Sequence, residues 1–395
     1  MTHHRTDLGG PLGRAWQRLS DRESFRLREA FVHSTPPPAT PRHFFGVFLA
    51  FLVLGLSLAS VLVGLWLAWV VLSPLPGMTE LGIIPRLCWG LLALILLLFA
   101  VQARPRFPHL PGQEVSAQQA PELHRLIQEV ATVLEVTPPT RILVDGEVNA
   151  FFGWSGFPPQ STLGLGLPLL YALPPQERVA LIAHELAHQR NQDPTRGWVV
   201  RLALNVLAHT VNALSPDRLM AATGDALQQL AQGAMRGLAL GPLGLYHLML
   251  VLVGEEQQRA EFRADLLASE VAGHAATLSL LDHFHLTGLL ESALHKQRHQ
   301  PERAHAFLEL GHLWSTLSEP ERERSRAEVA AQRRQLDATH PPTTDRMVVV
   351  AAFPREPQVR LDEAQARRLE DELTPFVRPL EQAAYEAYQA RYAQW

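Results

Sequence analysis

The sequence ERVALIAHELAH (residues 177–188) decides how the rest of the chain is interpreted. It follows the pair Pro174-Pro175, which suits the first turn of a helix, and it contains strong helix formers without an interior breaker. His184 and His188 stand four positions apart and therefore share one helix face. Two imidazoles at this spacing can reach one tetrahedral metal ion, and Glu185 can take a proton from a metal-bound water. The stretch predicts a metal-binding helix, and histidines satisfied by other partners in a core are the alternative.

A catalytic zinc site needs a third protein ligand and one open position for water. The chain has one cysteine, Cys88, which lies in an apolar run, so histidines and carboxylates must hold the metal. Glu261 and Asp265 fall on one face of a predicted helix. We expect Glu261 to be the third ligand and Asp265 to accept a hydrogen bond from a metal-bound imidazole. Taken alone, this run also fits an ordinary charged helix.

The charge balance excludes one class of partner. The chain carries 35 basic and 39 acidic residues, for a formal net charge of -4. Proteins that bind nucleic acid use an excess of basic residues to neutralise phosphates, and this chain has no such excess. We therefore expect no nucleic-acid partner.

The first hundred residues point to a membrane. A polar, arginine-rich arm over residues 1–42 precedes the apolar run Phe44–Leu72, which is long enough to span a bilayer. A turn-rich link leads to a second apolar run, Leu87–Val101, so residues 43–103 predict a transmembrane helical hairpin. Arginines flank both outer ends, which places the arm and the following domain in the cytoplasm by the positive-inside rule. A soluble core helix is the alternative for the first run.

The remaining chain predicts an α+β domain, mainly helical, over residues 115–353, followed by a helical C-terminal extension at 354–395. Strands are expected at 141–144, 148–152 and 162–167, after a helix at 120–134. The apolar stretches 198–214 and 238–253 could be membrane-embedded or interfacial. Because the chain must return to the same metal site, they add two crossings or none, so two or four spanning helices remain open.

These features together resemble the HtpX-like family of membrane-integrated zinc metallopeptidases, relatives of the CAAX prenyl proteases. The resemblance covers roughly residues 115–350 and rests on four sequence motifs that occur in the same order as in the family. They are Asn149-Ala150-Phe151, the zinc helix continuing to Asp193, Glu261-Phe262-Arg263-Ala264-Asp265, and Thr339-His340-Pro341-Pro342 with Arg346.

The resemblance implies a gluzincin-type domain with one Zn2+ per chain, held by His184, His188 and Glu261. It also implies an enzyme of the bacterial inner membrane that faces the cytoplasm and hydrolyses membrane or misfolded proteins, with Glu185 as general base. Its partners would be a protein or peptide substrate and the lipid bilayer. A zinc-holding scaffold or sensor without activity is the alternative, but such a site has no need of a base like Glu185.

Three further expectations follow. Arg346 should pair with Asp265 or Asp193 and tie the late segment to the ligand helices. His340 should donate a hydrogen bond to the developing oxyanion, because the prolines after it stiffen the segment; a rigid turn with His340 in solvent is the alternative. Asn149-Ala150-Phe151 should form an exposed edge strand that pairs with the substrate backbone, rather than a core strand with Phe151 packed inside.

Overall fold

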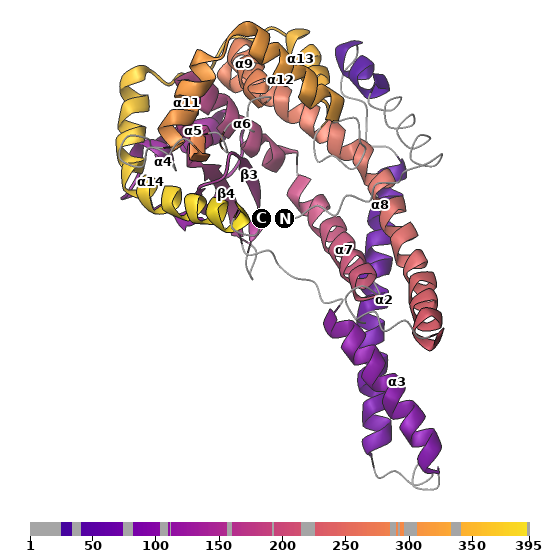
Figure 1. Cartoon of the computed structure of the whole chain (residues 1–395). Coiled ribbons are helices and arrows are strands. Elements are labelled where there is room, and N and C mark those ends of the chain that lie inside the picture. Colours follow the sequence, from indigo (N-terminus) through magenta and orange to yellow (C-terminus); the bar gives the residue numbers. More distant parts are fainter. Residues whose placement is uncertain are drawn as a thin grey trace. The chain divides into compact units, whose positions relative to one another are not determined.

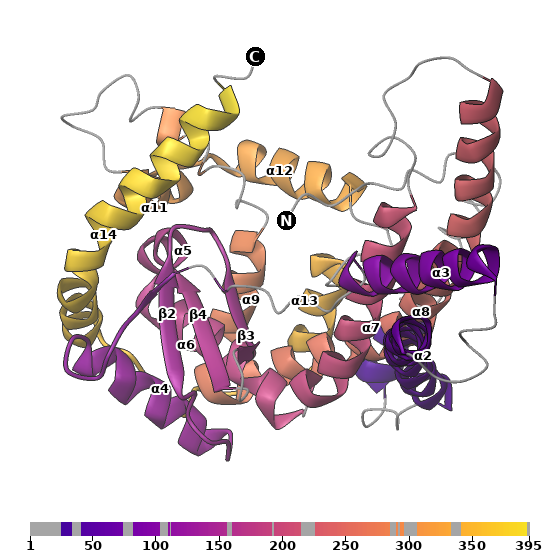
Figure 2. The same ribbon diagram turned by 90° about the horizontal axis from the view of Figure 1, so that it is seen from below.

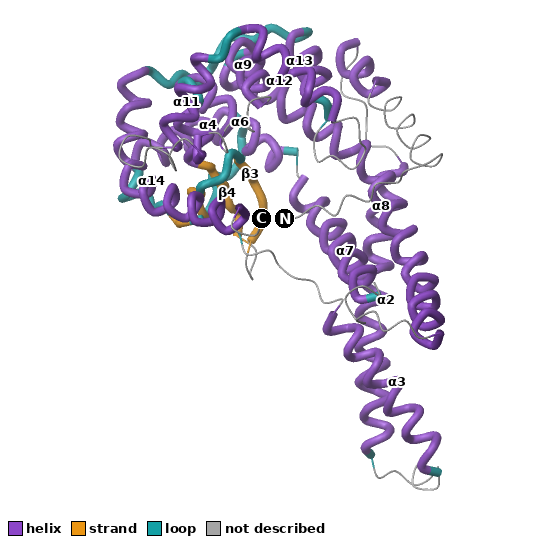
Figure 3. Tube along the Cα trace, in the orientation of Figure 1, coloured by secondary structure: helices purple, strands orange, loops and turns teal. Residues whose placement is uncertain are grey.

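The computed structural model describes residues 25–33, 41–73, 82–102, 110, 112–155, 160–191, 193–214, 226–284, 290, 293–295, 306–332 and 341–392. Helices dominate these residues, and a small sheet is the other regular element (Figure 3). The chain divides into two units. The sheet unit comprises Met1–Pro38, Pro108–Pro194 and Glu255–Trp395, and the apolar-helix unit comprises Ala39–Phe107 and Thr195–Gly254. The mainly helical α+β class is therefore as predicted.

The sheet has four strands in the order β1-β2-β4-β3. They are β1 (Gln113–Glu114), β2 (Arg141–Asp145), β3 (Ala150–Ser155) and β4 (Gln160–Gly166). β2 runs parallel to β4, whereas β1 and β3 run antiparallel to their neighbours. β3 consequently lies at one edge of the sheet (Figure 2). The sequence predicted β2, β3 and β4 but not β1, because two exposed polar residues carry no strand pattern.

Helices surround this sheet and share one hydrophobic core with it. Besides the last part of α8 (Ala226–Ala272), the labelled helices of the sheet unit are α4 (Pro121–Val133), α5 (Leu167–Ala172), α6 (Pro175–Arg190), α9 (His274–His283), α11 (Ala306–Thr316), α12 (Glu319–Gln332), α13 (Thr343–Ala351) and α14 (Glu363–Tyr392). The central helix is α6, in which every residue from Glu177 to Ala187 is buried. It packs against α4, α9 and β3. Polar groups within it therefore need partners inside the protein.

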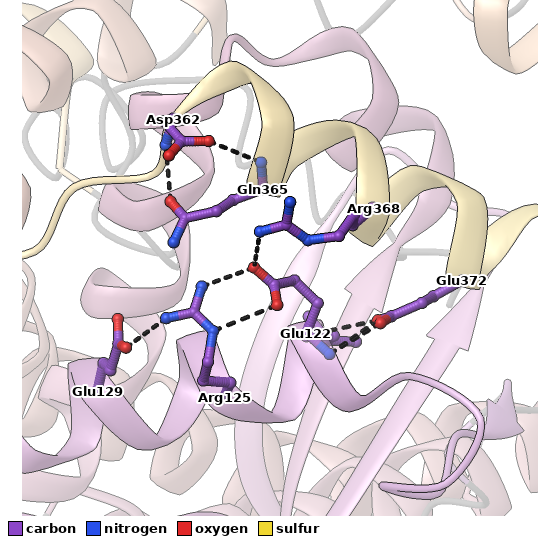
Figure 4. A network of polar contacts seen from close by, with 8 residues as sticks. Glu122, Arg125, Glu129, Asp362, Gln365, Arg368 and Glu372 are labelled. Atoms are coloured by element: carbon purple, nitrogen blue, oxygen red, sulfur yellow. Dashed lines mark hydrogen bonds and ion pairs between the residues drawn. The ribbon is translucent and has the colours of Figure 1, made fainter.

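Helix α14 belongs to the segment expected as a separate C-terminal extension, and it packs into the same core through residues such as Leu369. Its Glu372 carboxylate accepts hydrogen bonds from the backbone N–H of Glu122 at 2.9 and 3.0 Å, at the start of α4 (Figure 4). The residue before that helix, Ala120, has no side chain that could do so. Glu372 therefore caps α4 from a position 250 residues away in the sequence.

The apolar-helix unit contains α2 (Pro41–Leu72), α3 (Ile83–Gln102), most of α7 (Asp193–Ala213) and the first part of α8 (Ala226–Ala272) (Figure 1). Ala50 of α2, Ala203 of α7 and Met249 of α8 are buried in one cluster. α2 also packs against α3 at Gly64, where an added Cβ would lie 3.1 Å from the Leu97 side chain. The absence of a side chain at Gly64 allows the α2 and α3 backbones to approach closely there.

Two helices among the described residues are long and apolar enough to cross a membrane: Phe44–Leu72 in α2 and Gln232–Ala272 in α8. Only 22% and 17% of their apolar windows are buried within the chain, so the apolar side chains largely face outward. Ile83–Leu98 in α3 and Val199–Ala213 in α7 are shorter apolar helices. Pro242 lies inside α8 and does not end it, although proline usually interrupts a helix. This extent of exposed apolar surface fits contact with lipid.

Candidate metal centre

Three side chains from two helices converge on one point. His184 and His188 lie on α6 and Glu261 lies on α8, and one potential ligand atom from each lies within 4.8 Å of the others. The Nε2 atom of His184 is 3.5 Å from one Glu261 oxygen, and the Nε2 atom of His188 is 3.7 Å from the other. The two rings have centroids 5.0 Å apart and stand nearly perpendicular, at 88°. Both imidazoles therefore direct Nε2 to the same carboxylate.

This set of donors fits a zinc ion. Two imidazole nitrogens and one carboxylate oxygen, without sulfur, are a donor set typical of catalytic zinc sites, in which water takes the fourth position. The described residues contain one group of three or more His, Cys, Asp or Glu side chains that could hold a metal, and it is this one. His184 and Glu261 are buried, and His188 is partly buried. The site is therefore largely enclosed at His184 and Glu261 and more open to solvent at His188.

Asp265 supports the first of these ligands from behind. The Nδ1 atom of His184 lies 3.0 Å from one oxygen of Asp265, which leaves Nε2 for the metal. Arg346 of α13 donates to both oxygens of Asp265, through Nε and Nη2, at 2.7 Å each. Asp265 and Arg346 are almost fully buried. The sequence left open whether Arg346 meets Asp265 or Asp193, and the hydrogen bonds run to Asp265.

The charges in this cluster change two pKa values. Burial alone would lower the pKa of the His184 imidazole, but the Asp265 and Glu261 carboxylates raise it to about 10. Burial would raise the pKa of Asp265, but the Arg346 guanidinium and the His184 imidazole hold it below its usual value. Asp265 is therefore ionised and accepts the proton on His184 Nδ1 as a charge-assisted hydrogen bond.

Glu185 is also part of this region. It follows His184 on α6, is buried, and its charge acts on the buried Arg346. Its position between the two histidines in the sequence is what the proton-transfer role requires. Two other expected residues cannot be placed in this way: His340 lies outside the described residues, and so does the side chain of Asp193.

The expected substrate strand lies beside the metal helix. β3 pairs with β4 on one side, with Phe151 opposite Gly164, and α6 packs against β3. The Phe151 ring lies over Gly164 so closely that an added Cβ would come 2.1 Å from a ring carbon. Phe152 faces the core, whereas Ala150 and Phe151 are half-buried. Asn149 directly precedes the strand and its backbone oxygen accepts a hydrogen bond from Gly166.

Sequence analysis missed two sets of contacts made by the two helices that carry the ligands. On α6, the buried carboxylate of Glu177 accepts hydrogen bonds from Ser279 and from Nδ1 of His283, at 2.7 and 2.6 Å. A short helix over residues 25–33 places Phe31 against Phe262, the residue after the ligand Glu261. Both contacts join residues about a hundred or more positions apart, and no local pattern in the sequence marks them.

Comparison with known sequences shows the family of this chain. The family model "Peptidase family M48" matches residues 117–352. A protein named "Protease HtpX homolog" from Moorella thermoacetica is 31% identical over 84 residues, which are 21% of this chain and 28% of that protein. A protein of the same name from Trichormus variabilis is 24% identical over 171 residues, which are 42% of this chain and 58% of that protein. The matches thus span less than two thirds of either relative. Because the family model covers more than half of the chain and includes all three convergent ligands, the chain belongs to peptidase family M48.

Proposed function

We propose that this protein is a membrane-bound zinc-dependent endopeptidase with one zinc ion per chain, held by His184, His188 and Glu261. M48 peptidases bind zinc, and the chain supplies a matching ligand set. The observation that carries the proposal is the convergence of these three side chains from α6 and α8. A bound zinc ion would polarise the scissile carbonyl and make the attacking water more acidic.

Glu185 is the general base in this proposal. It takes a proton from the attacking water and passes it to the leaving amine, and no covalent bond forms between enzyme and substrate. The role is supported by its place on α6 next to His184 and by its burial beside the metal ligands. Asp265 fixes the proton of His184 on Nδ1, and Arg346 holds Asp265 in place.

The substrate is a protein or peptide that adds a strand beside β3, the edge strand of the sheet among the described residues. Residues Asn149, Ala150 and Phe151 would then pair with the substrate backbone, as extended peptides commonly bind at sheet edges. The edge position of β3 and its packing against α6 support this proposal. A peptide substrate N-methylated at alternating backbone amides should show a raised KM. An unchanged KM for every methylated position would contradict strand addition.

His340 is the proposed hydrogen-bond donor to the oxyanion of the tetrahedral intermediate. It directly precedes Pro341, which is buried, and the same segment continues to Arg346 at the metal centre. A proline pair after His340 limits the conformations of this segment. A positioned donor of this kind typically contributes about 3 kcal/mol to transition-state stabilisation.

The proposed location is a bacterial inner membrane, with the arginine arm and the metal domain in the cytoplasm. The candidate spans in α2 and α8 support a membrane location. The orientation rests on the expected hairpin of α2 and α3, because arginines flank its two outer ends. Membrane or misfolded proteins are the proposed substrates. Protease treatment of sealed, right-side-out vesicles should leave the metal domain intact. Digestion of that domain by protease added outside intact cells would contradict the proposed orientation.

A zinc-holding scaffold without activity is the rival function. Metal analysis of purified protein, combined with casein cleavage in the presence and absence of a chelator, separates the two. We expect one zinc per chain and cleavage that stops when the chelator removes it. Bound zinc without any cleavage would favour the scaffold, and absence of bound zinc would contradict both functions.

A further inference from the structure

The arginine-rich arm contains a helix that packs on the sheet unit. Residues 25–33 are helical, and Leu27 and Phe31 are buried, with 3% and 1% of their surface exposed. They form one hydrophobic cluster with Phe262 of α8 and Val349 of α13. The rings of Phe31 and Phe262 lie 5.2 Å apart at an angle of 42°. This helix lies outside residues 117–352, the part of the chain that matches the M48 family model.

A polar contact joins the same helix to α13. An Nη1–H of Arg28 donates to a carboxylate oxygen of Asp345 at 3.1 Å, and both side chains are partly buried. The Arg28 guanidinium also donates to Glu29 and lies 4.5 Å from the ring centroid of Phe25. These two neighbours on its own helix limit the positions that the guanidinium can adopt. Arg28 is therefore held in place to meet Asp345.

Both contacts involve residues that are adjacent in sequence to residues of the metal centre. Phe262 follows the ligand Glu261 on α8, and Asp345 precedes Arg346 on α13. The residues 25–33 thus touch the two helices whose side chains form the Arg346 and Asp265 pair. That pair consists of two parallel hydrogen bonds of 2.7 Å, and such paired bonds depend strongly on the relative position of the partners.

We propose that the helix of residues 25–33 positions the metal centre by holding α13 against α8, with Leu27, Arg28 and Phe31 as positioning residues. When the helix is docked, Arg346 keeps both hydrogen bonds to Asp265, and Asp265 keeps His184 oriented for the metal. When the helix leaves, α8 loses the contact of Phe262 with Phe31, α13 loses the contact of Asp345 with Arg28, and the orientation of His184 relaxes. The inference rests on the proposed zinc function, and it gives the cytoplasmic arm control over zinc retention.

The test uses the full-length protein and three single variants. Phe31→Ala removes the buried ring, Arg28→Ala removes the contact to Asp345, and Arg26→Ala is the matched control, because Arg26 is an exposed arginine on the same helix. The main readout is the rate at which a chelator captures zinc from the purified protein. We expect about tenfold faster zinc capture for Phe31→Ala. This corresponds to the lower end of the loss in metal affinity that follows when a residue supporting a metal ligand is removed. Arg28→Ala should show a smaller increase, and Arg26→Ala should match the wild type.

A second set of variants separates positioning from general packing. In an Asp265→Asn background Arg346 no longer has the Asp265 carboxylate to bind, so adding Phe31→Ala should speed zinc capture little beyond Asp265→Asn alone. A purely structural role for Phe31 would instead give effects that add. Limited proteolysis within the arm reports whether the helix has undocked. Should Phe31→Ala fail to fold, Arg28→Ala and its combination with Asp265→Asn decide the question.

Wild-type zinc capture in variants whose arm has become protease-sensitive would overturn the proposal, and so would additive effects with Asp265→Asn. The wild-type protein distinguishes this failure from failure of the proposed function. If the wild type holds one zinc and cleaves casein while Phe31→Ala behaves like Arg26→Ala, only the positioning role is wrong. If the wild type holds no zinc, the zinc function itself is wrong, and the positioning role is wrong with it.

Discussion

Replacing Asp265 by Asn should weaken zinc binding and destabilise the fold at the same time. Asp265 is 1% exposed, accepts two hydrogen bonds of 2.7 Å from Arg346, and lies 3.0 Å from Nδ1 of His184. Asparagine has the same shape, but it replaces one acceptor oxygen by an NH2 donor and removes the negative charge. One N–H of Arg346 or of His184 then faces a donor instead of an acceptor.

The size of each effect follows from this geometry. Breaking a buried ion pair by removing one partner typically costs about 3 to 5 kcal/mol, because the other charge stays buried without compensation. Loss of the partner that orients a metal-binding histidine typically lowers metal affinity by about 10- to 100-fold. We therefore expect the free energy of unfolding to fall by about 3 kcal/mol and the zinc affinity by at least about tenfold.

Asp282→Asn is the matched control. Asp282 also accepts two hydrogen bonds from one arginine, Arg326, at 2.6 and 2.7 Å, but this pair is partly exposed and joins α9 to α12. Pairs near the surface contribute about 0 to 1 kcal/mol, so Asp282→Asn should change stability little and zinc affinity not at all. Chemical denaturation and zinc titration against a competing chelator measure both quantities. Equal zinc affinity in the two variants would refute the supporting role of Asp265.

Three further predictions concern the same site. Glu261→Ala should purify without zinc, and retention of one zinc per chain in metal analysis would mean that another residue is the third ligand. Because the Asp265 and Glu261 carboxylates raise the pKa of His184 from 6.5 to about 10, the stability that this shift gives to chelator-treated protein is complete below about pH 6.5 and is lost as the pH rises towards 10. Over the same pH range zinc affinity should rise, because His184 must lose a proton before it can bind the metal. Thermal unfolding measures how stability changes with pH, and zinc titration measures how affinity changes with pH. A zinc affinity independent of pH would argue against this coupling. His340→Ala should lower kcat by about a hundredfold at unchanged zinc content, and an unaltered kcat in steady-state assays would remove His340 from the mechanism.

The sequence predicted the parts of the centre that depend on local spacing. His184 and His188 repeat at the helical period, and Glu261 and Asp265 repeat it on a second helix, so each pair shares a face whatever the surrounding fold. The strands β2 and β4 were predicted for a similar reason, because their runs of apolar residues stand between turn residues.

The sequence could not predict contacts that join distant segments. Phe31 meets Phe262, and Glu372 caps α4 from 250 residues away, because packing in three dimensions selects these partners. Both partner residues look ordinary in the sequence, as an apolar residue in a polar arm and a charged residue on a helix. The sequence also did not predict that one helix, α8, continues through Pro242, because a proline removes a backbone hydrogen bond and locally disfavours a helix.

The central claim is that Glu185 acts as the base for peptide hydrolysis at a zinc centre. Glu185→Gln keeps the size of the side chain and both imidazoles but cannot take a proton at neutral pH. Casein cleavage by this variant and by the wild type, compared at equal measured zinc content, is therefore the most direct test. The account predicts one zinc per chain in both proteins and cleavage reduced by at least about a hundredfold in the variant, the lower end of general-base contributions. Full cleavage by Glu185→Gln at equal zinc content would contradict it.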